Sequence, residues 1–186
     1  MTVALLFGSF NPIHIGHIKM AEAAIAYGVD EVWFIPSPQN PLKDSKELLS
    51  IDLRVNMVNL AIAEVSQFKT VDIEKHLETP SFTHRTLDVL SGLYEHNFVI
   101  LCGTDVLHQL PLWKNFTQIL ENYSFLVCKR AVSSDLPSTL EAYQNKFIFI
   151  PFEPNAISAS SVRSEGTRSE IAAVDQYIKD HHLYGH

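Results

Sequence analysis

Two histidines three positions apart, His14 and His17, are the residues whose types and spacing most directly suggest chemistry. They close the decapeptide GSFNPIHIGH, residues 8–17, which joins a short apolar run to a segment with helical apolar spacing. A helix that begins near His14 places both imidazoles on one face of its first turn, where unpaired N–H groups and the positive end of the helix dipole attract anions. The pair therefore predicts a phosphate site. Without context, the same spacing more often marks two ordinary surface or core histidines.

The residues around the two histidines favour the phosphate interpretation. Gly8 and Gly16 allow the backbone to approach a ligand closely, and Pro12 stiffens the loop. Neither histidine has a cysteine or carboxylate at the spacing of a zinc site. We therefore expect no metal ligands here, and a strand-to-helix turn that binds a small anion.

Short β-rich runs alternate with helical patterns along the whole chain. Each run is mostly apolar in its middle, as expected of strands that are covered on both faces. This alternation predicts an α/β fold, a Rossmann-like doubly wound parallel sheet with helices on both faces, in one domain over residues 1–186. Ligands are then expected at the carboxyl ends of the strands. The predicted strands are Val3–Phe7, Glu31–Ile35, Phe68–Ile73, Phe98–Cys102, Ser124–Lys129 and Phe147–Pro151.

Helical spacing identifies the segments between the strands. One apolar stripe follows Ser50 and Asp52, either of which is a plausible N-cap, and the segment from 169 to 182 repeats the pattern near the end of the chain. The three predicted stripes consist of Leu53, Met57, Leu60 and Ala61; of Leu87, Leu90 and Tyr94; and of Ile171, Val174 and Ile178.

Three loops after predicted strands carry polar groups. The proline-rich segment 36–43 ends in Lys43, which could reach a phosphate, although a solvated turn fits equally well. Ser81 and Thr83 precede a helical pattern, where they could cap the helix and also share its free N–H groups with a carboxylate. Asp105, two residues after Gly103, follows a buried strand and could accept hydrogen bonds from ribose hydroxyls.

Four further features have both a structural and a functional interpretation. Trp113 is more often a core residue than a ligand contact. Arg130 ends an apolar run and could simply be solvated. Cys102 and Cys128 lie in apolar runs and are expected to be reduced core thiols. The segment 157–163 combines hydroxyls with Arg163, a set that can hold phosphate oxygens or merely start a helix.

Composition excludes several classes of function. The chain of 186 residues has a net charge of -7 and only 14 Lys and Arg, scattered along it, which argues against a nucleic-acid platform. A small anion can still bind where a helix terminus and a few cations meet. The first apolar run is too short for a signal peptide, and no window approaches the length of a membrane span. We therefore expect a cytoplasmic protein with no membrane or nucleic-acid partner.

The motifs, in this order, resemble those of the bacterial nicotinate-nucleotide adenylyltransferases over nearly the whole chain. His14-Ile15-Gly16-His17 resembles the (H/T)xGH signature of the nucleotidyltransferase superfamily. An Arg-x-x-Met-x-x-x-Ala helix begins at Arg54, and a Ser-Tyr-Thr turn is matched at residues 81–83. A Gly-x-Asp-x-Leu segment at 103–107, followed by Trp113, and an Ile-Ser-Ser-Thr-x-Ile-Arg signature at 157–163 complete the resemblance.

The resemblance implies transfer of AMP from ATP to nicotinate mononucleotide, which gives deamido-NAD and pyrophosphate in NAD biosynthesis. It implies Mg²⁺ bound through the ATP phosphates and a possible homodimer. His14, His17 and Arg163 are the implied catalytic residues. The implied ATP-binding residues are these three together with Gly8, Ser9, Phe10, Lys43, Asp105 and Ser160. The implied acceptor-binding residues are Ser81, Phe82, Thr83, Gly103, Asp105, Trp113 and Arg130.

Several positions depart from the family pattern, and alternatives stay open. Phe7 replaces the first of the paired glycines; the other departures are Asn11 for aspartate, Leu42 for histidine, Phe82 for tyrosine and Ala159-Ser160 for Ser-Thr. Nicotinamide-nucleotide, pantetheine-phosphate and cytidylyl transfer share the same histidine chemistry. A class I aminoacyl-tRNA synthetase also uses His-Ile-Gly-His, but it needs a basic tRNA-binding surface. A nucleotide-binding sensor without turnover is the non-enzymatic alternative.

Overall fold

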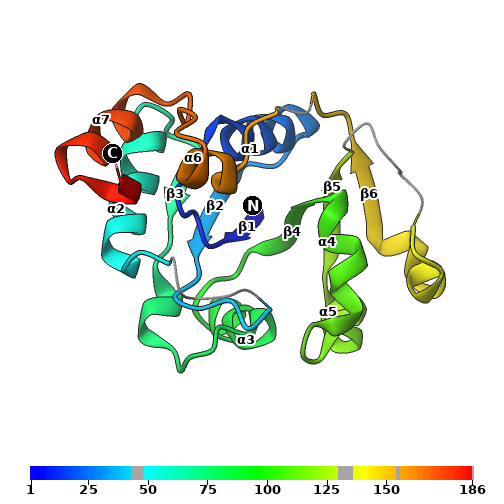
Figure 1. The fold of residues 1–186 in the computed structure, drawn as a ribbon. Coiled ribbons are helices and arrows are strands. Elements are labelled where there is room, and N and C mark those ends of the chain that lie inside the picture. The colour runs from blue at the N-terminus through cyan, green and yellow to red at the C-terminus, as the bar shows by residue number, and fades with distance from the viewer. Residues whose placement is uncertain (43–47, 130–135, 154–155, 186) are drawn as a thin grey trace.

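Six parallel strands form one sheet in the order β3-β2-β1-β4-β5-β6 in the computed structural model (Figure 1). The structure describes residues 1–42, 48–129, 136–153 and 156–185. The strands are β1 (Thr2–Gly8), β2 (Glu31–Pro36), β3 (Phe68–Thr70), β4 (Asn97–Gly103), β5 (Ser124–Cys128) and β6 (Phe147–Ile150). Chain order reverses direction between β1 and β4, so the crevice beside these two strands is the topological switch point of the sheet.

Helices cover both faces of the sheet. Alternate residues of β1 belong to different cores: Ala4 and Leu6 pack with α1, α2 and α7, whereas Val3 and Leu5 pack with α3, α4 and α5. This alternation is the period of two that a strand buried on both sides requires. The helices are α1 (Ile15–Tyr27), α2 (Ile51–Ile62), α3 (Thr83–Leu93), α4 (Thr104–Gln109), α5 (Phe116–Asn122), α6 (Ala159–Ser164) and α7 (Ala172–Asp180). Short 3₁₀ turns are η1 (Ile73–His76), η2 (Leu110–Leu112), η3 (Ser138–Lys146) and η4 (Leu183–Gly185).

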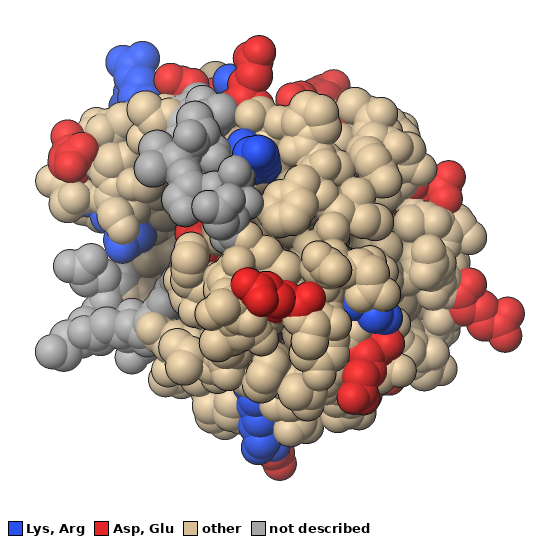
Figure 2. Space-filling model, turned by 90° about the vertical axis from the view of Figure 1, so that its right-hand side faces the viewer, with Lys and Arg blue, Asp and Glu red and all other residues tan. Residues whose placement is uncertain are grey.

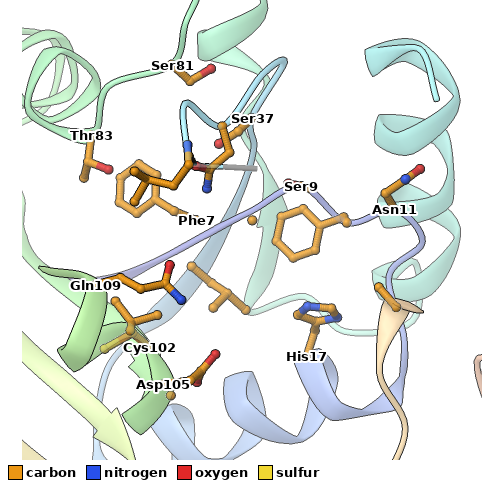
Figure 3. A pocket seen from close by; sticks show the side chains of 18 of the residues that line it. Phe7, Ser9, Asn11, His17, Ser37, Ser81, Thr83, Cys102, Asp105 and Gln109 are labelled. Atoms are coloured by element: carbon orange, nitrogen blue, oxygen red, sulfur yellow. Dashed lines mark hydrogen bonds between the residues drawn. The ribbon is translucent and has the colours of Figure 1, made fainter. Parts of the chain in front are cut away.

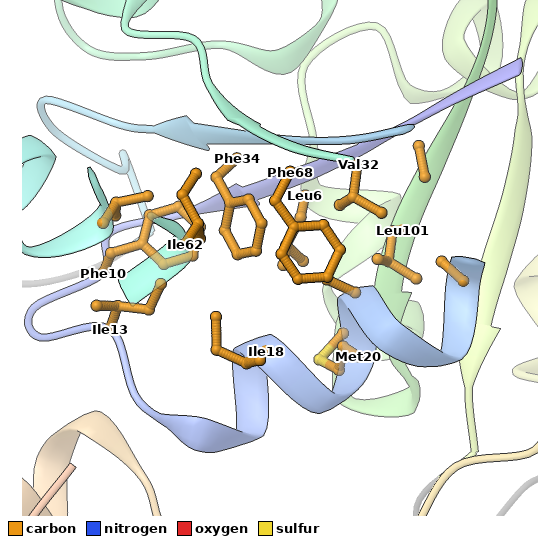
Figure 4. Close-up of a cluster of buried hydrophobic side chains, with 14 of the residues drawn as sticks. Leu6, Phe10, Ile13, Ile18, Met20, Val32, Phe34, Ile62, Phe68 and Leu101 are labelled. Atoms are coloured by element: carbon orange, nitrogen blue, oxygen red, sulfur yellow. The ribbon is translucent and has the colours of Figure 1, made fainter. Parts of the chain in front are cut away.

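The first core also anchors the turn between β1 and α1. Phe10 and Ile13, from the turn itself, lie in the same cluster as Phe34 and Ile18 (Figure 4). Phe10 is 2% exposed and adopts a φ of 44°, a left-handed conformation that is unfavourable for a phenylalanine. Burial of its ring offsets this cost. The turn is therefore held in place from below by apolar packing.

The predicted doubly wound sheet is confirmed, and all six predicted strands are present. β3 ends at Thr70 rather than Ile73, because Ile73 begins η1. Ser50 caps α2, accepting a hydrogen bond from the Leu53 N–H at 3.4 Å. Both cysteines are buried free thiols, as expected.

Two of the predicted stripes need correction. Leu60 is 39% exposed, and Arg54 and Val58 are buried beside Met57 in its place. Arg54 can be buried because backbone carbonyls surround its guanidinium. An apolar pattern in the sequence cannot reveal such a buried arginine. In the second stripe Leu87 and Leu90 are buried, but Tyr94 follows the end of α3 and is 41% exposed.

The surface carries its charges in a mixed pattern. On the face shown in Figure 2, Lys and Arg side chains are interspersed with Asp and Glu rather than gathered into a basic patch. Over the ranges that the structure describes, no helix combines the length and the apolar character needed to cross a membrane.

Candidate active site

A cavity of about 960 Å³ opens at the switch point, at the carboxyl ends of β1 and β4 (Figure 3). Its floor is the end of β1 and the turn that follows, and its walls come from loops after β2 and η1, from α4 and η2, and from the start of α6. These elements are far apart in the sequence and meet only because the parallel strands end at one edge. Of the predicted site residues, those that line the cavity are Gly8, Ser9, Phe10, His14, His17, Ser81, Phe82, Thr83, Gly103, Asp105, Trp113, Ser160 and Arg163.

His14 and His17 cap α1 reciprocally. His14 is the N-cap residue, and its Nδ1 accepts the Gly16 N–H at 3.2 Å, while His17 Nδ1 accepts the His14 N–H at 3.2 Å. The two rings lie 3.9 Å apart, centroid to centroid. An Nδ1 that accepts a backbone N–H carries no proton, so a neutral imidazole in this position carries its proton on Nε2. Both rings are thereby fixed as Nε2 donors at the wall of the cavity.

Two glycines make room for this arrangement. A Cβ at Gly16 would lie 3.0 Å from Nδ1 and Cε1 of His14, so any larger residue would push the capping ring away. A Cβ at Gly8 would lie 2.9 Å from the tip of the Phe10 ring. That ring meets the His17 ring edge-on at a centroid distance of 5.1 Å. Phe10 therefore supports His17 from the core.

Phe7 lies at the end of β1, at the position where the family pattern has a glycine. Its half-buried ring packs against the core cluster of α3, α4 and α5 and also lines the cavity. Gly8 follows it and pairs with Pro36 of β2. The Phe7 ring thus forms part of the cavity wall on the side of α3. The Phe10 ring can lie against the backbone of residue 8 because that residue is a glycine.

Arg54 clamps the loops on the floor of the cavity. Its side chain is 1% exposed and donates to four backbone carbonyls, those of Leu49 at 2.9 Å, Ser9 at 2.5 Å, Ser37 at 2.8 Å and Pro38 at 3.1 Å. Burial lowers its pKa to about 10, so the guanidinium remains charged at neutral pH. One side chain therefore ties the loop after β1 to the loop after β2.

Arg163 approaches the turn from α6. Its Nη1 donates to the carbonyl of Asn11 at 2.7 Å and its Nη2 to the Ser160 hydroxyl at 3.4 Å. Asn11 is itself held by its side-chain oxygen, which accepts from Tyr184 at 2.8 Å and from the Leu49 N–H at 3.3 Å. A cation and a hydroxyl from the C-terminal part of the chain thus join the histidines at one end of the cavity.

The opposite end is formed by the start of α3. Phe82 is the N-cap residue of this helix, and its side chain makes no capping hydrogen bond. The predicted capping role of Ser81 or Thr83 is therefore wrong: Ser81 lies before the cap, where its backbone N–H donates to the Gln39 carbonyl at 2.9 Å. Thr83, the first residue of α3, lines the cavity, so the start of this helix lies at this end beside the Thr83 side chain.

Aromatic and charged side chains line the same end. The Lys114 ammonium lies 4.8 Å and the Arg85 guanidinium 5.3 Å from the centre of the Phe82 ring. Trp113, for which the sequence alone favours a place in the core, is half-buried after η2; it packs against the core and also lines the cavity. Asp105, in the first turn of α4, is exposed at the wall between the two ends.

Two predicted residues, Lys43 and Arg130, lie outside the described residues. The residues that line the cavity without having been predicted from the sequence include Ser37, Glu74, Gln109 and Lys114, and Arg54 had no predicted function. Glu74 follows an edge strand and has no periodicity to mark it. Of these residues, only Lys114 could have been predicted from the sequence, because it is a cation next to Trp113.

No three His, Cys, Asp or Glu side chains are grouped so as to hold a metal ion in the part of the chain that is described. The positive charge of Arg163, which lines the histidine end of the cavity, suits phosphate oxygens.

Comparison with known proteins identifies the family. A family model described as Cytidylyltransferase-like matches residues 5–165. A protein of Cytophaga hutchinsonii named "Probable nicotinate-nucleotide adenylyltransferase" is 44% identical over 78% of this chain and 76% of its own length. The chain belongs to the nicotinate-nucleotide adenylyltransferase family. A protein of the same name from Oceanobacillus iheyensis is 33% identical over 98% of this chain and 96% of that one.

Solved structures agree with this family membership at the level of the fold. The nicotinic acid mononucleotide adenylyltransferase of Plasmodium falciparum complexed with NaAD superposes with a TM-score of 0.80, at 20% identity, over 99% of this chain and 97% of that one. The same enzyme complexed with APC gives a TM-score of 0.77 over the same shares. The nicotinate-nucleotide adenylyltransferase fold thus extends over nearly all of the chain.

Proposed function

We propose that this chain transfers the adenylyl group of ATP to nicotinate mononucleotide and releases pyrophosphate and deamido-NAD. The observation that carries the proposal is the reciprocal histidine cap: two fixed Nε2 donors at one end of a cavity whose other end is an uncapped helix N-terminus. The first suits a phosphate under attack, and the second suits a carboxylate. Membership of the nicotinate-nucleotide adenylyltransferase family supports the same acceptor.

The reaction needs position and charge rather than a base. An oxygen of the acceptor phosphate, already ionised at neutral pH, attacks the α-phosphorus of ATP as the bond to the β-phosphate oxygen breaks. The electron pair of that bond leaves with pyrophosphate, so no proton has to be removed from the nucleophile. This requirement agrees with the histidine end, where two imidazoles and the Arg163 guanidinium line the cavity.

His14, His17 and Arg163 would act at the ATP end. The two Nε2–H groups donate to phosphate oxygens as negative charge grows toward the leaving group, and Ser160 and Arg163 hold the triphosphate. Ser9 and Gly8 present backbone close to the nucleotide, Phe10 supports His17 from below, and Asp105 accepts from ribose hydroxyls. Lys43, beyond the described residues, is proposed to reach the same phosphates.

Mg²⁺ is proposed to enter with ATP, bound through the ATP phosphates. The ion would neutralise charge on the departing pyrophosphate, and the phosphates would be its ligands. The protein's own contribution is to hold those phosphates through the two histidines and Arg163.

The acceptor end would bind the pyridine nucleotide. Its ring carboxylate meets the first-turn N–H groups of α3 and the Thr83 hydroxyl, beside Ser81 and Phe82. Trp113 lies along the ring, Gly103 and Asp105 complete the wall toward the ribose, and Arg130 is proposed to contact the acceptor from outside the described ranges.

Pyrophosphate release from Mg-ATP tests the proposal. Three reactions are compared, with nicotinate mononucleotide, nicotinamide mononucleotide or phosphopantetheine as acceptor, and the product is identified chromatographically. Release with nicotinate mononucleotide as the best acceptor is expected. Pyrophosphate release only with phosphopantetheine would show that the protein catalyses a different adenylyl transfer. No release with any acceptor would favour a nucleotide sensor without turnover.

A further inference from the structure

One buried acid is left unexplained by the adenylyl transfer described above. Glu74, in η1, is 2% exposed and yet lines the cavity at the end that α3 forms. A carboxylate in such a place is costly unless it is paired or hydrogen-bonded at both oxygens. Its position therefore calls for a specific reason.

The two oxygens of Glu74 have different surroundings. Oε1 accepts the hydroxyl proton of Thr86, from α3, at 2.7 Å, and both side chains are buried. Oε2 is buried and makes no hydrogen bond of good geometry with any described residue. The hydroxyls of Ser37 and Ser81 are nevertheless close enough to lower the pKa of the carboxyl, against the larger effect of burial, which raises it. Figure 3 shows these two serines on the same side of the cavity as Thr83.

Among the described residues, no charged side chain compensates the acid. The titratable side chains on its own turn are Asp72, Lys75 and His76, and those on the segment that leads into α3 are Glu78, His84 and Arg85. None of them contributes to the pKa shift of Glu74. Lys75 pairs with Asp52 of α2, and Arg85 lies 3.5 Å from Glu78.

The buried cation on the floor of the cavity is also engaged elsewhere. Arg54 of α2 binds the Ser37 and Pro38 carbonyls rather than the carboxyl. The surroundings of Glu74 thus consist of hydroxyl groups and apolar atoms, which favour its neutral form.

We propose that Glu74 is a positioning and specificity-determining residue of the acceptor end, where its uncharged carboxyl orients the Ser37 and Ser81 hydroxyls toward an anionic ring substituent. The inference rests on the proposed function, because it takes the acceptor to carry a carboxylate. Glu74 itself does not touch the reacting atoms.

The direction of the hydroxyl protons links the acid to the ligand. A neutral Glu74 donates from Oε2 to a serine oxygen, and that serine then donates its own proton toward the cavity. An ionised Glu74 accepts the serine proton instead. The serine oxygen then presents a lone pair to the ligand, and the carboxylate places a buried negative charge next to the serine. Ser81 already accepts the Gln39 N–H at 3.5 Å, so its single proton goes either to the acid or to the ligand. Binding of an anion and protonation of Glu74 therefore favour each other.

Titration calorimetry with nicotinate mononucleotide tests this coupling between about pH 7.5 and pH 9, above the ordinary pKa of histidine and of nucleotide phosphates. In the wild-type protein the Kd is expected to rise by up to about tenfold per pH unit, with uptake of up to one proton per nucleotide. Glu74→Gln keeps the size and polarity of the side chain but cannot ionise, so its Kd is expected to be independent of pH. Glu78→Gln, the same substitution at an exposed residue four positions on, should keep the wild-type profile.

A second measurement reads the acid without any ligand. Because the pKa of Glu74 is raised in the folded state, the folded protein holds a proton that the unfolded chain has lost, and stability falls as the pH rises from the unfolded pKa to the folded one. The wild-type unfolding constant should therefore increase relative to that of Glu74→Gln by up to about tenfold per pH unit across this window. If Glu74→Gln does not fold, the proton uptake of the wild-type protein decides the question.

The outcomes separate this inference from the proposed function. Superposed pH profiles of the wild-type and Glu74→Gln proteins, or binding without proton uptake, overturn the inference even if deamido-NAD is formed. Failure of nicotinate mononucleotide to bind or react overturns the proposed function, while the unfolding measurement still reports whether Glu74 is neutral.

Discussion

The two ends of the cavity are built in different ways. At the histidine end, backbone groups fix the functional side chains: His14 and His17 cap α1, Arg54 binds four carbonyls, and Arg163 binds the carbonyl of Asn11. At the acceptor end, the contacts run between side chains of separate loops, with a buried carboxyl, hydroxyls and an aromatic ring flanked by cations.

This difference matches what the proposed reaction requires of each end. Donors that stabilise developing charge must be in place before the reaction, and backbone hydrogen bonds hold them without reorganisation. Discrimination between an acceptor with a carboxylate and one with a carboxamide depends on which polar groups of the site are left unpaired. Side chains can adjust this pairing. We therefore expect substitutions at the histidine end to lower kcat and those at the acceptor end to raise the acceptor KM.

His17→Ala should have the largest effect. Removal of one preorganised donor typically costs on the order of 10²–10³ in rate, and we expect at least this loss in kcat. Loss of its capping hydrogen bond should cost only about 1 kcal/mol, so the fold survives. Steady-state kinetics and thermal unfolding are compared with those of His108→Ala, an exposed histidine of α4 that does not line the cavity. Near-normal turnover of His17→Ala would remove the assigned role.

Arg54→Lys tests whether the floor of the cavity depends on the clamp. A lysine cannot reach four carbonyls in a planar array, and buried acceptors left without a donor cost about 1–3 kcal/mol each. We expect a clear fall in the free energy of unfolding, together with lower kcat, because Ser9 and Ser37 lose their common anchor. Wild-type stability with full activity would show that the two loops are held by other contacts.

Trp113→Leu examines the acceptor end alone. Loss of aromatic contact with the pyridine ring, worth about 0.5–1.5 kcal/mol beyond its buried area, should raise the acceptor KM several-fold. The KM for ATP and the kcat should change little, since the histidine end is intact. Tyr94→Leu, at an exposed aromatic residue outside the cavity, is the matched control. A fall in kcat with unchanged acceptor KM would break the division between the two ends.

Tyr184→Phe should have the smallest effect. The hydroxyl donates to the Asn11 side chain at 2.8 Å, and a hydrogen bond of this kind contributes about 1 kcal/mol. A slight loss in unfolding free energy is expected, with kcat within about twofold, because Arg163 still holds the Asn11 carbonyl. A loss in kcat comparable to that of His17→Ala would mean that the C-terminal turn positions the histidines.

Periodicity was enough to predict the fold. Residues 3 to 6 point alternately into two cores, so all of them are buried. The sequence shows this as an unbroken run of apolar residues that ends before a glycine. The pairing of His14 with His17 was predictable as well, because the two residues are three positions apart in the sequence and their type is unusual. The structure adds what the pattern could not contain: that Nδ1 of each histidine faces the backbone, and that Gly16 makes room for the His14 ring.

The acceptor end was less predictable because its parts meet only in the folded chain. Ser81 and Thr83 had the composition of caps, yet Phe82 occupies the N-cap position. Glu74, like Arg54 at the histidine end, is a charged residue in a buried place. The partners of Arg54 are backbone carbonyls, and that of Glu74 is a hydroxyl of α3. A charge with a distant, neutral partner leaves no spacing to detect.

A competition assay tests the central claim most directly. Wild-type protein is given Mg-ATP with equal amounts of nicotinate and nicotinamide mononucleotide, and the ratio of the two dinucleotide products measures the ratio of their kcat/KM values. The account predicts that deamido-NAD dominates by at least about tenfold, because the uncapped start of α3 and the neutral Glu74 favour a carboxylate. Equal amounts of both products, or an excess of NAD, would contradict it.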